Sequence, residues 1–130
     1  MISNNTNKKT VLLVEDDIFS IELTKKVLKN ICLLEIAVSG IEAVEHVKAN
    51  QYDAILMDIN LGKGIDGVQA TTLIRSIPGY GSIPIIALTS YVEKNQIKEF
   101  FANGCTYHIP KPLMIDSFII FMKRLLGTNL

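Results

Sequence analysis

Acidic residues follow two apolar runs in this chain of 130 residues. The run VLLV is followed by Glu15, Asp16 and Asp17, and the run AILM is followed by Asp58. Carboxylates that lie close together raise one another's pKa, so a cluster of them holds either protons or a cation. Mg²⁺ suits such a site, because it takes oxygen ligands from one or two carboxylates together with water.

Two further apolar runs end in residues that can bind an oxyanion. IPIIAL is followed by Thr89 and Ser90, and YHI continues through Pro110 into Lys111. A bare cation site does not need a hydroxyl and an ammonium group, but a tetrahedral oxyanion beside a metal does. The combination therefore indicates phosphoryl transfer to an oxygen nucleophile.

Each of these residues also has a purely structural interpretation. Acids after a strand can complement a helix dipole, and an aspartate such as Asp58 can cap a loop. Thr89 can bond to its own backbone, and Lys111 can be a solvated surface charge. Several such residues at one edge of a sheet nevertheless favour a functional site, because doubly wound sheets bind ligands at the carboxyl ends of their strands.

The elements that must position these residues alternate regularly. Five short apolar runs begin near residues 11, 32, 54, 83 and 107, with longer amphipathic stretches between them. This pattern predicts repeated βα units. The runs show almost no polar alternation, as expected of a parallel sheet covered on both faces. The predicted fold is α/β, a doubly wound five-stranded parallel sheet flanked by five helices.

Local patterns indicate where the helices lie. Helices are expected over 17–30, 40–50 and 113–126, and the first carries an apolar stripe at four-residue spacing: Phe19, Leu23, Val27 and Ile31. Two capping-box patterns predict helix starts: Ser39 with Glu42, and Ser90 with Glu93. Two glycines stand where left-handed C-caps fall: Gly104 and Gly127.

The composition narrows the class of protein. Hydrophobic residues make up 48% of the chain and 13 basic residues balance 13 acidic ones, so we expect a compact domain without direct nucleic-acid binding. No apolar run approaches the ~18 residues of a membrane span and no secretory signal is present, so we expect a cytoplasmic protein without membrane contact. Cys32 and Cys105 are expected to be buried free thiols.

Four motifs, in this order, closely resemble those of the response-regulator receiver domain of two-component signalling: VLLVEDD, ILMDINL, IIALTS and GCTYHIPKPL. The resemblance covers residues 10–126 and makes 1–130 a single domain. It implies a flavodoxin-like fold with strand order 2-1-3-4-5. It also implies that Asp58 accepts a phosphoryl group from a phosphohistidine, with no other enzymatic activity. The implied ligands of Mg²⁺ or Mn²⁺ are Glu15, Asp16, Asp58 and the backbone carbonyl of Asn60, and those of the phosphoryl oxygens are Thr89 and Lys111.

The resemblance further implies a switch, made by Thr89 and residue 108. The family typically has Tyr or Phe at the second position, so His108 predicts an altered or pH-sensitive switch. Asn60 and Tyr91 are the side chains that would modulate dephosphorylation, and the bulky Tyr91 predicts slow loss of phosphate. A cis peptide bond is expected at Lys111-Pro112.

The implied partners are a sensor histidine kinase or a histidine phosphotransfer protein, and a downstream target or fused output domain. No output domain follows Leu126, so output is expected through protein contacts, unless the chain was cut from a larger protein. The chain itself is expected to be a monomer or a weak phosphorylation-linked dimer.

The loop after Asp58 departs from the family pattern. Over 62–65, Gly62 replaces the usual proline and the loop looks one residue longer, so its conformation is not predicted. The metal site is expected to precede this loop.

Three other functions stay open. One is a receiver-like interaction module that works without phosphorylation. Another is an aspartyl-phosphate hydrolase of the haloacid dehalogenase type, which would want an aspartate where this chain has Asn60. The third is a flavin carrier, which would want a glycine-rich phosphate loop where this chain has EDD.

Overall fold

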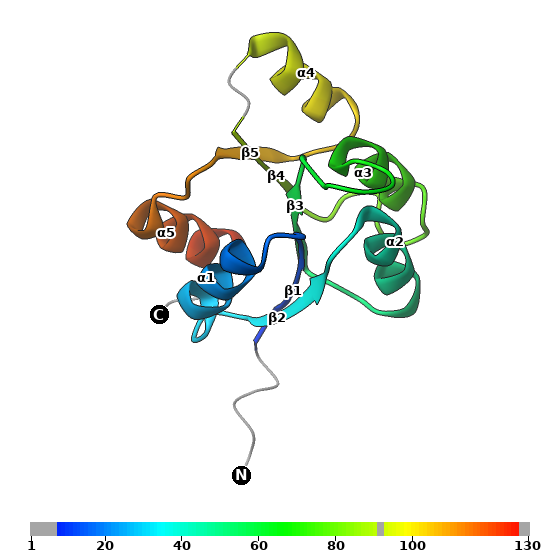
Figure 1. Ribbon diagram of the computed structural model, residues 1–130. Helices are drawn as coiled ribbons and strands as arrows, with labels where there is room; N and C mark the ends of the chain where they lie inside the picture. Colours follow the sequence, from blue (N-terminus) through cyan, green and yellow to red (C-terminus); the bar gives the residue numbers. More distant parts are fainter. Residues whose placement is uncertain (1–7, 91–92, 128–130) are drawn as a thin grey trace.

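The computed structural model describes residues 8–90 and 93–127 (Figure 1). Strands and helices alternate along this part of the chain, as the apolar runs predicted. The strands are β1 (Thr10–Val14), β2 (Leu33–Ala37), β3 (Ala54–Asp58), β4 (Ile85–Thr89) and β5 (Tyr107–Pro110). The helices are α1 (Ile18–Leu28), α2 (Gly40–Ala49), α3 (Gly67–Arg75), α4 (Lys94–Ala102) and α5 (Ile115–Leu126).

The strands form one parallel sheet in the order β2-β1-β3-β4-β5. In Figure 1, α1 and α5 lie on one face of the sheet and α2, α3 and α4 on the other. β3 and β4 are buried along their whole length. The predicted doubly wound fold and its strand order are confirmed. No helix in residues 8–90 or 93–127 has both the length and the apolar character that a membrane crossing requires.

Each face of the sheet packs a separate hydrophobic core, because successive side chains of a strand point to opposite faces. The core under α2, α3 and α4 includes Ile55, Ile74 and Phe100. The core under α1 and α5 includes Leu56, Phe118 and Met122. Each core also contains one buried free thiol, as predicted: Cys105 in the first and Cys32 in the second. Burial raises the pKa of Cys32 to about 11 and also raises the pKa of Cys105.

The stripe predicted on α1 is wrong at its start. Phe19 is 81% exposed and Leu23 is 43% exposed, whereas the buried residues are Ile21, Thr24 and Leu28. Each four-residue step over-rotates a helix by about 40°, so a stripe with that spacing drifts off the buried face. Thr24 can be buried because its hydroxyl donates to the carbonyl of Ser20 at 2.8 Å.

The start of α2 follows the capping pattern, but the start of α4 does not. Ser39 Oγ accepts the N–H of Glu42 at 3.1 Å, although the Glu42 carboxylate returns to the N–H of Val38 and not to that of Ser39. α4 begins only at Lys94, with Glu93 as N-cap and no side-chain capping bond, so a start at Ser90 is wrong. β4 ends at Thr89, and an N-cap at the next residue would leave no connection between strand and helix. The two predicted C-cap glycines do have positive φ angles: 113° at Gly104 and 70° at Gly127.

Candidate functional site

The carboxyl ends of four strands bring the predicted residues to one edge of the sheet. Asp58 ends β3 and Thr89 ends β4, while Glu15 and Lys111 directly follow β1 and β5. The N–H of Glu15 donates to the carbonyl of Ala37, and the N–H of Lys111 donates to that of Thr89, both at 2.9 Å. Strand-like hydrogen bonding therefore continues one residue past β1 and β5 and holds the backbone of both residues in place.

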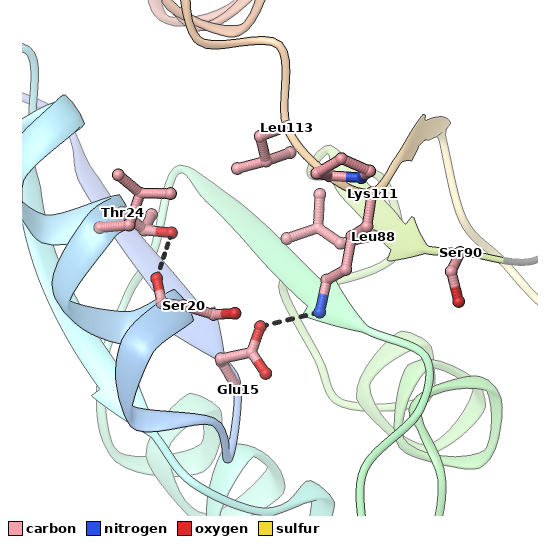
Figure 2. A pocket seen from close by; sticks show the side chains of 9 residues that line it. Glu15, Ser20, Thr24, Leu88, Ser90, Lys111 and Leu113 are labelled. Carbon is pink, nitrogen blue, oxygen red and sulfur yellow. Dashed lines mark hydrogen bonds and ion pairs between the residues drawn. The ribbon is translucent and has the colours of Figure 1, made fainter.

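Lys111 bridges two buried carboxylates. Its Nζ lies 3.0 Å from Oε1 of Glu15 and 3.3 Å from Oδ1 of Asp58. The side chains of the two acids are 3% and 4% exposed, and that of Lys111 is 26% exposed. Figure 2 shows Glu15 and Lys111 pointing toward one another at the side of a pocket of about 330 Å³, which Ser20, Thr24 and Leu113 also line. One ammonium group is thus shared by two carboxylates.

The pKa values of Glu15 and Lys111 reflect both the burial of these groups and the charges of their neighbours. Burial is the largest cause that raises the pKa of Glu15 to about 7; Asp58 raises it further and Lys111 opposes the rise. Burial lowers the pKa of Lys111, but its hydrogen bonds and charge interactions with Glu15 and Asp58 outweigh that effect and raise it. Near neutral pH the cluster therefore favours an added proton or a cation.

The acids form a group that fits a hard divalent cation. Glu15, Asp16 and Asp58 each offer an oxygen atom, and these atoms all lie within 4.8 Å of one another. Mg²⁺ and Mn²⁺ prefer oxygen ligands, and Mg²⁺ usually keeps several waters beside one or two carboxylates. The backbone of Asn60 lies beside this cluster, because its N–H donates to Oδ1 of Asp58 at 3.0 Å.

Asp17, the third acid of the run, has a structural role. It is the N-cap of α1, and its carboxylate accepts the N–H of Ser20 at 2.8 Å. Bonding to Ser20 lowers the pKa of Asp17, as expected of a carboxylate that receives a backbone donor. The structural interpretation of acids after a strand is therefore correct for Asp17, whereas Glu15 and Asp16 belong to the cluster.

One contact at the site was not predicted. The metal site was expected to precede the loop after β3, but the backbone N–H of Gly62 in this loop donates to Oδ2 of Asp16 at 2.8 Å. The available signal was the replacement of a proline, which has no N–H, by a glycine, which has one.

Comparison with known proteins identifies the family. The family model of the response regulator receiver domain matches residues 11–122, which include the acids, Asp58, Thr89 and Lys111. The chain belongs to this family. Receiver domains are signalling domains, so neither the hydrolase nor the flavin-carrier alternative is supported.

Relatives of this receiver domain include both long and short proteins. Transcription factor SKN7 from Candida albicans is 38% identical over 118 residues, which cover 89% of this chain and 21% of that protein. The polar-differentiation response regulator DivK from Brucella ovis is 30% identical over 120 residues, which cover 92% of this chain and 97% of DivK. This chain thus spans about a fifth of the length of such transcription factors and nearly all of DivK.

Solved receiver domains have the same fold. The receiver domain of the sensor histidine kinase PA1611 from Pseudomonas aeruginosa is 29% identical, with a TM-score of 0.83 over 93% of this chain and 99% of that one. Its structure holds a magnesium ion coordinated in the active-site cleft. A response regulator structure from Chloroflexus aurantiacus is 28% identical, with a TM-score of 0.84 over 92% of this chain and 98% of that one.

Two further features expected from the sequence lie on or directly after β5, and a third lies outside the described residues. The Lys111-Pro112 peptide bond is cis, as predicted. His108 pairs with Ala87 of β4, and its ring centroid lies 6.2 Å from that of Phe100. Its Nε2 is buried and has no hydrogen-bond partner. Tyr91, the other residue expected beside the phosphoryl group, lies outside the described residues.

Proposed function

We propose that this receiver domain accepts a phosphoryl group on Asp58 from a phosphohistidine donor and thereby switches a protein-interaction surface. The position of Asp58 carries the proposal. It ends the central strand β3, is buried, and lies beside Lys111 and two further acids. A carboxylate so placed meets a positive charge and a cation site at the same point, which is what phosphoryl transfer to an oxygen nucleophile requires.

In the proposed step, an oxygen of Asp58 forms a bond to phosphorus while the phosphorus–nitrogen bond of the donor breaks and the imidazole nitrogen keeps the electron pair. Lys111 and the hydroxyl of Thr89 bind the phosphoryl oxygens. The ligands proposed for Mg²⁺ are Glu15, Asp16, Asp58 and the backbone carbonyl of Asn60. When bound, the cation neutralises charge on the transferring group.

The test is phosphorylation by a small acyl phosphate in the presence of Mg²⁺, followed by intact-mass measurement. The wild type should gain the mass of one phosphoryl group, and Asp58→Asn should gain none. Asp17→Asn is the matched control, because it makes the same change in a neighbouring acid and asparagine still caps a helix. Labelling of Asp58→Asn at the wild-type rate would overturn the proposal.

The proposed switch uses Thr89 and His108, which lie on the adjacent strands β4 and β5. A phosphoryl dianion on Asp58 would attract the hydroxyl of Thr89 and change the space beside β5. His108 is placed to respond, because its buried Nε2 has no partner to hold it in the present position. The proposed readout surface is the face formed by α4, β5 and α5.

The lifetime of the phosphoryl group is proposed to depend on Asn60 and Tyr91. Hydrolysis requires a water in line with phosphorus, so flanking side chains either orient that water or exclude it. Asn60 can hydrogen-bond a water, whereas Tyr91 is bulky and carries no carboxylate. We expect slow self-dephosphorylation, which Tyr91→Ala should accelerate by about tenfold or less in a phosphate-release assay. A wild-type rate in this variant would show that Tyr91 does not shield the site.

The proposed partners are a sensor histidine kinase or a histidine phosphotransfer protein as donor, and a downstream protein or fused output domain as target. The relatives support this choice, since they include transcription factors and the osmosensing histidine protein kinase SLN1 from Saccharomyces cerevisiae, which is 36% identical over 117 residues. A receiver that works without phosphorylation would not need the buried acids and lysine, which are present here. No direct nucleic-acid contact is proposed, and the chain is proposed to be a monomer or a weak dimer linked to phosphorylation.

A further inference from the structure

We propose that the backbone N–H of Gly62 positions the carboxylate of Asp16 for the cation, so that the loop between β3 and α3 forms part of the metal site. Asp16 is an exposed side chain in the connection between β1 and α1. Its Oδ2 accepts the N–H of Gly62 at 2.8 Å, across 46 residues of sequence. The bond joins the first βα loop of the chain to the third.

The loop that supplies this donor is held at several points. At its start, the N–H of Asn60 donates to Oδ1 of Asp58 at 3.0 Å. At its end, the N–H of Gly67 donates to the carbonyl of Ile59 at 3.2 Å. A Cβ on Gly67 would overlap the Asp58 carbonyl oxygen, so α3 begins in direct contact with the backbone of β3. Both ends of the loop that carries Gly62 are therefore held against the end of β3.

The hydrogen bond orients the carboxylate of Asp16 and leaves one of its oxygens available to a cation. A carboxylate has two oxygens and about four acceptor positions, so a donor on Oδ2 leaves Oδ1 available. Fixing the side chain before a ligand arrives removes part of the entropy cost of binding. The N–H also places a partial positive charge beside Asp16, the one acid of the three that forms no ion pair with Lys111 in the described residues.

Residue 62 suits this role because it is glycine. Proline, the usual residue here in the resembling family, could not donate. A Cβ at position 62 would lie 2.8 Å from Oδ2 of Asp16, which is closer than real Cβ contacts and would push the carboxylate away. Glycine alone supplies the donor and leaves the acceptor in place.

The inference rests on the proposed cation site and is tested by Mg²⁺ affinity, measured by titration calorimetry on the full chain. Gly62→Pro, which removes the donor, should weaken binding by about tenfold, and Gly62→Ala, which keeps the donor but crowds the acid, by about two- to threefold. In an Asp16→Ala background, Gly62→Pro should cause no further loss, because the two residues act through one bond. Gly81→Ala is the control, since a Cβ there meets nothing within 4 Å.

A second measurement does not depend on how well the proline variant folds. In the wild type, the amide proton of Gly62 should be slow to exchange both without and with Mg²⁺ and should lose this protection in Asp16→Ala. Fast exchange in the Mg²⁺-loaded wild type, or undiminished affinity in a folded Gly62→Pro, would overturn the inference and leave the proposed function standing. A wild type that binds no Mg²⁺ would overturn both.

Discussion

Buried polar groups at the two ends of the sheet differ in charge: they are ionisable acids at the carboxyl end and neutral hydrogen-bonded groups at the amino end. At the carboxyl end, Glu15 and Asp58 share Lys111, and the pKa of Glu15 is raised to about 7. At the amino end, the hydroxyl of Tyr80 donates to the carbonyl of Asn50 and accepts the N–H of Tyr52 at 3.1 Å. Both of these tyrosines are buried.

This difference separates stability from function within one small domain. A buried polar group with neutral partners stabilises the fold, whereas buried like charges cost free energy unless they are compensated. We infer that the amino end stabilises the sheet and that the carboxyl end gives up stability to keep charge available. Substitutions at the amino end should therefore lower stability and spare function, and substitutions at the carboxyl end should impair function and spare stability.

Asp16→Ala should produce the largest effect and sharpen the contrast. Loss of a direct ligand should weaken Mg²⁺ binding by at least about 100-fold, because even partners outside the ligand shell contribute 10- to 100-fold. Phosphorylation should slow accordingly. The free energy of unfolding without Mg²⁺ should not fall, since one of three crowded carboxylates is removed. Titration calorimetry and urea unfolding measure the two quantities, and unchanged affinity would contradict the assignment of Asp16 as a ligand.

Tyr80→Phe, at the amino end, should affect stability and not function. It leaves the Asn50 carbonyl and the Tyr52 N–H without their partner, which should cost about 2 kcal/mol of stability, while the phosphorylation rate stays at the wild-type value. Tyr107→Phe makes the same change at an exposed position and should change stability by less than about 0.5 kcal/mol. The contrast between the two ends would break if Tyr80→Phe slowed phosphorylation without lowering the midpoint of thermal unfolding.

The raised pKa of Glu15 at the carboxyl end should also make the stability of the protein depend on pH, which is a smaller effect. Because the folded pKa of Glu15 is about 7 and its ordinary value is 4.5, the folded state binds more protons between these values. This contribution to stability is fully present below pH 4.5 and is lost as the pH rises through 7. Its slope is at most about 1.4 kcal/mol per pH unit.

Urea unfolding at several pH values without divalent cations measures this slope. Glu15→Gln should flatten it, and saturating Mg²⁺ should oppose it, because the cation favours the deprotonated acids. A slope that is the same in Glu15→Gln and in the wild type would show that another group is responsible.

The sequence was sufficient to predict the fold and the cluster at the carboxyl edge. Apolar runs without polar alternation belong to a parallel sheet that is covered on both faces, and a parallel sheet collects the residues at its strand ends. Glu15, Asp58, Thr89 and Lys111 follow from this rule, because each stands at a strand end or one residue beyond it.

Features that depend on contacts distant in sequence could not be predicted in this way. The four-residue spacing put Phe19 in the apolar stripe of the first helix, but which face of α1 is buried depends on packing against the sheet and α5. The pattern from Ser90 to Glu93 is local, whereas the start of α4 depends on where β4 ends. The bond between Gly62 and Asp16 joins two loops, and no local pattern describes such a pair.

The two buried cysteines can report local opening of the two helical layers separately. The chain contains two cysteines, and each lies in a different core. Thiols react as thiolates, and burial with raised pKa values keeps both groups protonated and shielded at neutral pH. A thiol-trapping reagent therefore modifies Cys105 only when the layer of α2, α3 and α4 opens, and Cys32 only when the layer of α1 and α5 opens. The two labelling rates would report how often each layer opens locally in the native protein.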